Sequence, residues 1–138
     1  MQILVVDDEK NQVKSLSLGL RPHGIKVLEA YNASQALSQL NCNARVIDMV
    51  ITDNAMPEMG GIELVNAIKQ TYSWIPVVMM SANGNEKLMR EAFHNGCESY
   101  MAKPFTIEEL IHEIQRINLN NGCKYETKKE EIKRENQR

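Results

Sequence analysis

The sequence predicts an α/β fold, a doubly wound parallel sheet of five strands with helices on both faces. Five apolar runs of strand length alternate with segments in which apolar residues recur every three or four positions. This alternation is typical of parallel sheets that are covered by helices. The chain of 138 residues is long enough to bury a core without disulfides or a structural metal. We therefore expect a single core.

The expected strands are short apolar runs. In chain order they lie near Ile3–Asp7, Lys26–Ala30, Ile47–Asp53, Ile75–Ser81 and Glu98–Ala102. The helices between them are predicted from apolar residues that share one helical face. These stripes consist of Val13, Leu16 and Leu20, then Ala33, Ala36, Leu37 and Leu40, then Ile62, Val65 and Ile68, then Leu88, Met89, Ala92 and Phe93.

The last helix has a recognisable start. Thr106 and Glu109 have the spacing of a capping box, in which the two side chains satisfy free backbone N–H groups of the first turn. Phe105, just before the cap, can pack on Leu110 as a hydrophobic staple. The stripe that follows consists of Ile111, Ile114 and Ile117, and the run Asn120-Asn121-Gly122 is a plausible helix stop.

The charge distribution divides the chain into a domain at residues 1–119 and a charged C-terminal linker or tail at residues 120–138. The first part carries 14 acidic and 10 basic side chains, whereas the second carries 4 acidic and 6 basic ones. The tail has few apolar residues, so we interpret it as a linker or an exposed helix without a core of its own. Its charges can pair along a helix, which favours a solvated face over a nucleic-acid site.

Composition narrows the function classes. The formal net charge of −2 argues against direct nucleic-acid binding. The three cysteines, Cys42, Cys97 and Cys123, are odd in number and lack metal-ligand spacing, which indicates reduced thiols. The apolar run at the amino terminus soon meets Asp7, so it predicts neither a signal peptide nor a membrane span. We expect a soluble, cytoplasmic protein with no membrane association.

Polar and charged side chains stand at the carboxyl ends of the predicted strands. They are Asp7, Asp8, Asp53, Ser81 and Lys103. The carboxyl ends of parallel strands gather at one edge of the sheet, where such folds bind ligands. Three carboxylates at one site repel each other unless a cation is present, and an all-oxygen cluster suits Mg²⁺. Mg²⁺ is therefore the predicted ion, and zinc is disfavoured because neither Cys nor His falls at these strand ends.

The same residues predict phosphoryl chemistry. A metal ion, the Lys103 ammonium and the Ser81 hydroxyl together would form a receptor for the oxygens of a phosphoryl group. Asp53, at the end of the buried strand, is then the candidate nucleophile, because carboxylates form aspartyl-phosphate intermediates. The cluster by itself is compatible with an active site or with a metal site alone.

Four short motifs occur in order at these strand ends. They are Val5-Val6-Asp7-Asp8-Glu9, then Asp53-x-x-Met56-Pro57 with Gly61 behind it, then Met80-Ser81-Ala82, then Tyr100-Met101-Ala102-Lys103-Pro104-Phe105. Each is weak alone, but together they make residues 1–119 resemble the receiver domain of two-component response regulators, in the CheY-like superfamily. The resemblance implies a flavodoxin-like sheet with strand order 2-1-3-4-5, flanked by five helices.

Carried over to this sequence, the resemblance implies roles for the acidic residues. Asp53 would accept a phosphoryl group from the phosphohistidine of a sensor histidine kinase or a phosphotransfer protein. Asp8 and Asp53 would bind Mg²⁺ directly, together with the backbone carbonyl of Ala55, and Asp7 would hold the ion through water. The domain would catalyse its own phosphorylation and slow dephosphorylation, so we expect a signalling domain and not an enzyme.

The resemblance also implies which residues respond to phosphorylation. Lys103 would pair with the phosphoryl oxygens, and Ser81 would move inward to hydrogen-bond to one of them. Tyr100 would follow Ser81 as an aromatic switch. The peptide bond between Lys103 and Pro104 is typically cis in this family. Ser81 stands where the family more often has Thr, and Gly60 where it often has Asp.

The expected output surface combines the helix around residues 88–93, the strand Glu98–Ala102 and the last helix, and two copies could dimerise through it. The linker-like tail favours a regulator with a C-terminal effector domain such as a transcriptional activator. Its ending, Glu135-Asn136-Gln137-Arg138, resembles linkers of NtrC-type regulators. A stand-alone phosphorelay or chemotaxis-type receiver is the alternative context.

Two other classes of function stay open at this point. A phosphatase of the haloacid-dehalogenase class also combines an aspartyl nucleophile, Mg²⁺, Ser or Thr, and Lys, but its pattern is Asp-x-Asp on the first strand. This chain has adjacent Asp7 and Asp8 there, and its candidate nucleophile, Asp53, lies on the third strand. The other alternative is a phosphorylation-independent interaction module, which would neither bind Mg²⁺ nor change on beryllofluoride addition.

Overall fold

A computed structural model describes residues 1–82 and 84–120 of the chain. Its five strands form one parallel sheet in the order β2-β1-β3-β4-β5. The strands are β1 (Gln2–Val6), β2 (Lys26–Ala30), β3 (Met49–Asp53), β4 (Val77–Ser81) and β5 (Ser99–Ala102). Each expected strand is therefore present, with ends within two residues of the expected ones, and the expected strand order is confirmed.

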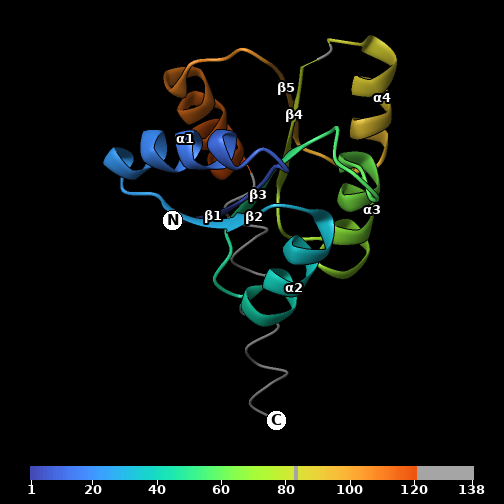
Figure 1. Cartoon of the computed structure of the whole chain (residues 1–138), viewed down its shortest axis with the longest axis horizontal. Helices are drawn as coiled ribbons and strands as arrows, with labels where there is room; N and C mark the ends of the chain where they lie inside the picture. The colour runs from blue at the N-terminus through green and yellow to red at the C-terminus, as the bar shows by residue number, and fades with distance from the viewer. Residues whose placement is uncertain (83, 121–138) are drawn as a thin grey trace.

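Helices follow the strands along the chain (Figure 1). They are α1 (Lys10–Leu20), which continues into the short 3₁₀ helix η1 (Arg21–His23), then α2 (Ala33–Asn43), α3 (Gly61–Thr71) and α4 (Glu86–His94). The last helix occupies residues 107–120 of the described chain. The doubly wound fold with five flanking helices is thus confirmed for the part of the chain that the structure describes.

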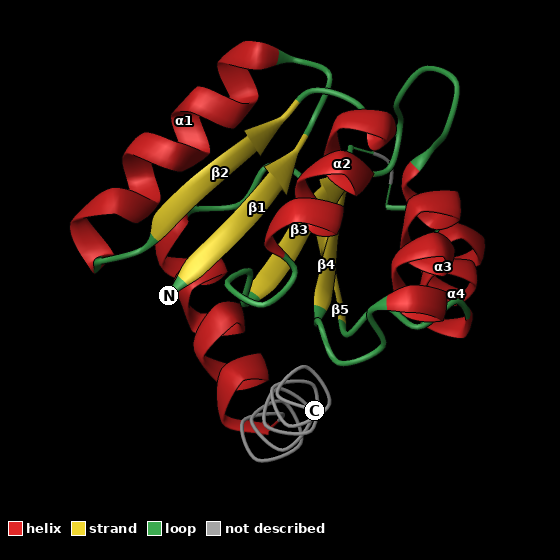
Figure 2. Ribbon diagram, turned by 90° about the horizontal axis from the view of Figure 1, so that it is seen from below, coloured by secondary structure: helices red, strands yellow, loops and turns green. Residues whose placement is uncertain are grey.

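Two apolar clusters cover the two faces of the sheet (Figure 2). On one face α2, α3 and α4 pack over the strands, and on the other face α1 and the last helix do so. Successive residues of a strand point to opposite faces, so Leu4 and Val6 join the first cluster while Ile3 and Val5 join the second. The central strands β3 and β4 are buried along their whole length, as expected for a sheet covered on both sides.

Local hydrogen bonds fix where the helices begin. The Asn32 side chain accepts a hydrogen bond of 2.8 Å from the Gln35 N–H and caps α2. The Thr106 hydroxyl accepts one of 3.1 Å from the Glu109 N–H, so the predicted cap of the last helix is confirmed. Phe105 packs against the apolar cluster that contains Leu110, as the staple requires. These caps satisfy backbone donors that a helix start leaves free.

The apolar stripe of α4 differs from the expectation. Ala92 is the one α4 residue that is buried, and Phe93 is 46% exposed. The helical period of the sequence is correct, but α4 lies towards the β5 edge of the sheet, where less of its face is covered. The stripes of α3 and the last helix also shift slightly, because Leu64 is fully buried while Ile62 and Ile111 are half-buried.

Two expectations cannot be compared with the fold. The predicted helix stop at Asn120-Asn121-Gly122 and the charged tail lie, apart from residue 120, outside the described residues. Among the residues that the structure does describe, no helix combines the length and apolar composition that a membrane crossing requires.

Candidate functional site

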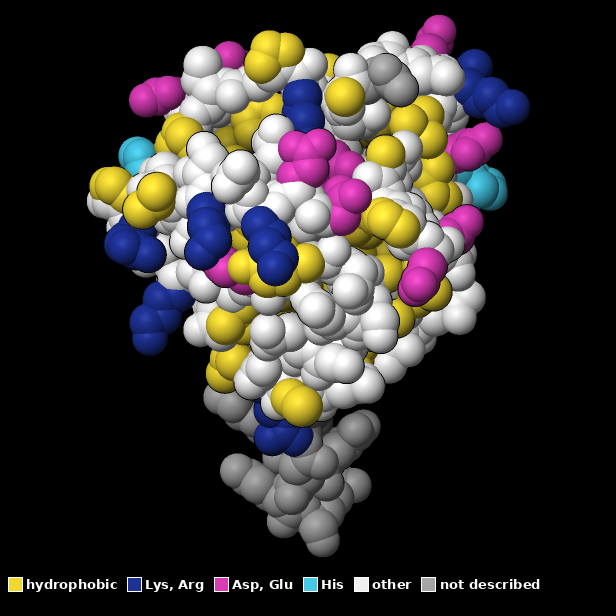
Figure 3. Space-filling model, in the orientation of Figure 1, with side chains coloured by type: hydrophobic (Ala, Val, Ile, Leu, Met, Phe, Trp, Pro, Cys, Tyr) yellow, Lys and Arg dark blue, Asp and Glu magenta, His cyan; other side chains and the backbone are white. Residues whose placement is uncertain are grey.

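The carboxyl edge of the sheet gathers the predicted site residues. Asp7 directly follows β1, Asp53 ends β3, Ser81 ends β4 and Lys103 directly follows β5. Backbone hydrogen bonds continue past the strand ends, from the Asn54 N–H to the Met80 carbonyl (2.9 Å) and from the Lys103 N–H to the Ser81 carbonyl (2.8 Å). The parallel pairing thus extends to the residues just after the strands, so these side chains lie together at the carboxyl ends of the strands. Acidic side chains gather near the centre of the face in Figure 3.

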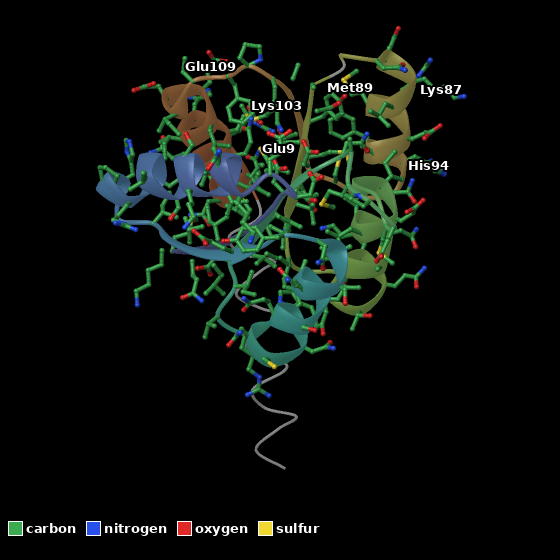
Figure 4. All side chains as sticks on the ribbon, viewed as in Figure 1. Glu9, Lys87, Met89, His94, Lys103 and Glu109 are labelled. Atoms are coloured by element: carbon green, nitrogen blue, oxygen red, sulfur yellow. The ribbon has the colours of Figure 1, made fainter. Side chains whose placement is uncertain are left out.

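Lys103 joins two buried carboxylates. Its Nζ lies 2.7 Å from Asp53 Oδ1 and 3.3 Å from Asp7 Oδ2. Asp7 is 1% exposed and Asp53 is 7% exposed, and carboxylates so deeply buried need such partners. Figure 4 labels Lys103 beside the last helix and Glu9 at the start of α1.

Backbone N–H groups hold the remaining oxygens of the same two carboxylates. The Glu9 N–H donates to Asp7 Oδ1 at 3.0 Å, and the Ala55 N–H donates to Asp53 Oδ2 at 3.1 Å. Each carboxylate therefore has one oxygen on the main chain and the other on Lys103. Because both oxygens are fixed, the two acids keep a defined orientation towards the edge of the sheet.

The pKa values of Asp7 and Lys103 are both raised, but for different reasons. Burial raises the pKa of Asp7 above its ordinary value and the charge of Asp53 adds to this, while the Glu9 N–H and Lys103 oppose it. Burial by itself lowers the pKa of Lys103, but its hydrogen bonds and charge interactions with Asp53 and Asp7 outweigh this and raise it. Lys103 is thus held firmly protonated, whereas ionised Asp7 is incompletely compensated.

A divalent cation fits this arrangement. Asp7, Asp8 and Asp53 each offer a carboxylate oxygen, and these oxygens lie within 4.8 Å of one another. Asp8 is exposed, so a bound ion could keep water ligands, as Mg²⁺ prefers. The donors are all oxygen, and a second positive charge would relieve the repulsion around Asp7. The acidic cluster of the prediction is therefore present.

Ser81 and Tyr100 lie on the neighbouring strands. Ser81 is 4% exposed and pairs in register with Ala102, next to Lys103. Tyr100 is half-buried in the middle of β5 and packs against the cluster under α2, α3 and α4. Its ring also lines a groove of about 830 Å³ between α4, β5 and the last helix. The structure brings Ser81 to the acidic edge, whereas Tyr100 pairs with Met79, two residues before Ser81, and lies on the side of that groove.

The loop after Asp53 explains why a glycine stands at position 61. A Cβ on Gly61 would lie 2.6 Å from the Asp53 carbonyl oxygen and 2.8 Å from the Asn54 Cα. The Gly61 N–H donates to the Asn54 carbonyl at 2.8 Å. Glu58, in the same loop, has φ of 67°, a left-handed conformation that non-glycine residues adopt at a cost. The start of α3 therefore braces the main chain of Asp53.

Sequence reasoning missed the main-chain donors at Glu9 and Ala55. Any residue can supply a backbone N–H, so no residue type signals it. Ala55 was expected to act through its carbonyl, and the structure additionally gives its N–H a role towards Asp53. The expected cis peptide bond between Lys103 and Pro104 is confirmed.

A doubly wound sheet of this strand order, with acids and a lysine at its carboxyl edge, defines a CheY-like domain. A family model described as the response regulator receiver domain matches residues 3–115. The chain therefore belongs to the response regulator receiver family, which serves two-component signalling. The family match takes the place of the phosphatase alternative, in which the nucleophile would lie on the first strand and not at the end of β3.

Relatives and solved structures agree with this assignment. The transcriptional regulatory protein CpxR of Escherichia coli strain K12 is 34% identical over 116 residues, which cover 84% of this chain and 48% of CpxR. NtrX from Brucella abortus, solved in complex with ATP, matches with a TM-score of 0.84 and 29% identity, over 92% of this chain and 29% of that one. CheY in the CheX-CheY-BeF3-Mg complex from Borrelia burgdorferi matches with a TM-score of 0.81 and 25% identity, over 85% and 88%. The chain thus spans about half the length of CpxR.

Proposed function

We propose that Asp53 is the phosphoryl acceptor of this receiver and that its phosphorylation requires Mg²⁺. The observation that carries the proposal is the position of Asp53, a nearly buried carboxylate at the end of β3 with Lys103 Nζ 2.7 Å away and two further carboxylates beside it. A purely structural ion pair needs neither Asp8 nor an excess of acid. A phosphoryl acceptor needs both a cation site and a fixed ammonium.

The residues of the site would divide the reaction among them. An oxygen of Asp53 attacks phosphorus of a phosphohistidine, the P–N bond breaks, and its electron pair stays on the imidazole of the donor. Lys103, already protonated and in place, neutralises charge on the transferred oxygens. Mg²⁺ would be held by Asp8, Asp53 and the Ala55 carbonyl, and through water by Asp7, and it would supply further charge neutralisation. The donor would be a sensor histidine kinase or a phosphotransfer protein.

The response would start at Ser81 and pass to Tyr100. Ser81 ends β4 and pairs with Ala102, the residue before Lys103, which supports a role for its hydroxyl as a hydrogen-bond partner of a phosphoryl group on Asp53. Its inward movement would vacate space that the Tyr100 ring then fills, which changes the groove between α4, β5 and the last helix. In our proposal this face, which includes the exposed Phe93, is the output surface and a candidate dimer interface.

The favoured context is a longer regulator with an effector domain. CpxR is named a transcriptional regulatory protein and is about twice as long as the matched region, and NtrX likewise extends well beyond it. These lengths support an effector domain after the receiver, which would include control of transcription and the NtrC-type context. A stand-alone receiver is the second candidate, because the match covers 88% of the Borrelia CheY chain.

Mass spectrometry after incubation with acetyl phosphate and Mg²⁺ tests the proposal. We expect the mass of one added phosphoryl group on the wild type, its absence in Asp53→Asn, and its absence when EDTA removes Mg²⁺. An unmodified wild type, or an Asp53→Asn variant that still gains the group, would refute the assignment. Steady turnover of a small phosphomonoester would instead indicate phosphatase chemistry. Sedimentation with and without beryllofluoride tests dimerisation.

A further inference from the structure

Lys10 begins α1 close in sequence to the acidic residues, and its side chain contacts Tyr31 after β2, at the other end of the strand order from Lys103. It is the first residue of α1 and follows Asp8 by two positions. Lys103 follows β5 at one end of the sheet order, whereas Lys10 leans towards β2 at the other end, where it meets Tyr31. The acids at the ends of β1 and β3 therefore have a half-buried lysine towards β5 and an exposed lysine towards β2.

Tyr31 holds Lys10 in this place. Lys10 Nζ lies 5.4 Å from the centroid of the Tyr31 ring, within the range of a cation–π interaction. The Tyr31 hydroxyl donates to Glu29 Oε2 at 2.6 Å, which fixes the ring, and the main-chain N–H of Tyr31 donates to Gln35 Oε1 at 2.8 Å, which fixes the backbone. The lysine is thus packed on an anchored ring, although its side chain is exposed.

The anchor is tied directly to the acidic edge. The Asp7 N–H donates to the carbonyl of Ala30, the residue before Tyr31, at 3.2 Å. A lysine in the first turn of a helix is otherwise disfavoured, because the positive end of the helix dipole repels it. The Tyr31 ring offsets this repulsion and keeps the ammonium at the end of β2, the strand next to β1. A fixed cation at the mouth of a charged site attracts anions and repels cations.

We propose that Lys10, positioned by Tyr31, is a specificity residue that draws small anionic phosphoryl donors of the acyl phosphate class to Asp53 and weakens Mg²⁺ binding. The part that concerns donors rests on the proposed function of Asp53. The part that concerns Mg²⁺ rests on the acidic cluster alone. Lys10 is not placed on the reacting atoms, so it changes the encounter with the donor and leaves the chemical step unaltered.

The test compares Lys10→Gln with Lys26→Gln, in the full chain. Lys26 is also exposed, but it begins β2 and so lies at the amino ends of the strands, opposite the acidic site. Its loss makes the same change in net charge far from that site. At low salt, Lys10→Gln should raise KM for acetyl phosphate roughly two- to fivefold with kcat unchanged, and tighten Mg²⁺ binding by a similar factor. Lys26→Gln should leave both constants near wild type.

Tyr31→Leu examines the positioning. It should produce part of the Lys10→Gln effect on KM and on Mg²⁺ affinity. The Lys10→Gln/Tyr31→Leu double variant should show the same KM and Mg²⁺ affinity as Lys10→Gln, because Tyr31 acts only through Lys10. Equal behaviour of Lys10→Gln and Lys26→Gln would overturn the proposal, as would additive effects in the double variant. Mg²⁺ titration by calorimetry does not depend on phosphorylation. If Asp53 took no phosphate but Lys10→Gln still tightened Mg²⁺ binding, the proposed function would fail and the electrostatic role of Lys10 would stand.

Discussion

The two edges of the sheet use lysine–carboxylate pairs in different ways. At the amino ends of the strands, Lys69 near the end of α3 pairs with Glu98. Both charged groups have a further hydrogen bond, because Lys69 Nζ donates to the Ile75 carbonyl and Glu98 accepts from the Val77 N–H. At the carboxyl edge, Lys103 is shared by Asp7 and Asp53, with Asp8 beside them. The amino edge ties elements together, whereas the carboxyl edge keeps an excess of negative charge. In this fold, fully paired charges contribute to stability, whereas incompletely paired charges remain available to bind a ligand.

The strongest way to break the comparison is to remove each lysine in turn. Lys103→Met should slow phosphorylation of Asp53 by acetyl phosphate about 100-fold, because a fixed cation is lost from the developing phosphoryl charge. Lys69→Met, at the other edge, should leave the rate near that of the wild type. The measurement is the rate of phosphoprotein formation at saturating Mg²⁺. Comparable rate losses in both variants would show that the edges are not functionally distinct.

A second prediction concerns the brace behind Asp53. Gly61→Ala places a methyl group against the main chain of Asp53 and Asn54, so it should lower the free energy of unfolding by about 1–3 kcal/mol and also slow phosphorylation. Urea denaturation measures the first effect. Gly84→Ala is the matched control, because its Cβ would meet nothing within 4 Å. Equal stability of the two variants would contradict the brace.

The amino-edge pair should show itself in stability. Glu98→Gln keeps the shape of the side chain but removes its charge from Lys69, and it weakens the hydrogen bond from the Val77 N–H. We expect a loss of about 1–2 kcal/mol in the free energy of unfolding, with phosphorylation unaffected. Denaturant titration and the phosphorylation assay on the same preparation decide the point, and a slower phosphorylation rate would count against it.

The smallest effect should have the opposite sign. Asp7→Asn removes an acid whose pKa is raised mainly by burial, so without Mg²⁺ the variant should be more stable than the wild type by about 1 kcal/mol, and Mg²⁺ binding should weaken. Because the folded-state pKa lies above the ordinary 3.8, the folded wild type holds this proton more tightly than the unfolded chain. Its stability therefore falls as pH rises from about 3.8 through the folded pKa.

Asp7→Asn should lack that part of the pH dependence. Thermal unfolding in EDTA across this pH range, with the two proteins side by side, measures it. If the wild type unfolded at a higher temperature than Asp7→Asn in EDTA at neutral pH, Lys103 would fully compensate the cost of burying the Asp7 charge. Addition of Mg²⁺ should narrow or reverse the difference, since the ion stabilises the wild type more.

Much of the fold and the edge of the site could be predicted from the sequence. Short apolar runs for strands, a period of three to four for helices and the spacing of a capping box are local signals, so the five strands and the cap at Thr106 are as expected. The grouping of Asp7, Asp53, Ser81 and Lys103 follows from parallel strands, because their carboxyl ends meet at one edge. Their proposed chemical roles and the division at residue 119 stay predictions.

The remainder needed distances between segments that are far apart in the chain. The exposure of Phe93 depends on where α4 sits relative to β5, which its own periodicity does not encode. The contact of Lys10 with Tyr31 joins α1 to the residue after β2, and nothing in either segment indicates it. The close approach of Gly61 to Asp53 likewise becomes visible only when α3 is placed against β3.

By itself, then, the sequence determined the order of elements, the residue types at the strand ends and the family motifs that they form. Only the tertiary structure decided how their charges are shared: that Lys103 bridges Asp7 and Asp53, that main-chain N–H groups at Glu9 and Ala55 hold the other oxygens, and that burial falls most heavily on Asp7. The reason is physical. Periodicity and residue type act over a few positions, whereas Coulomb interaction and desolvation depend on distances and burial that exist only after the chain has folded.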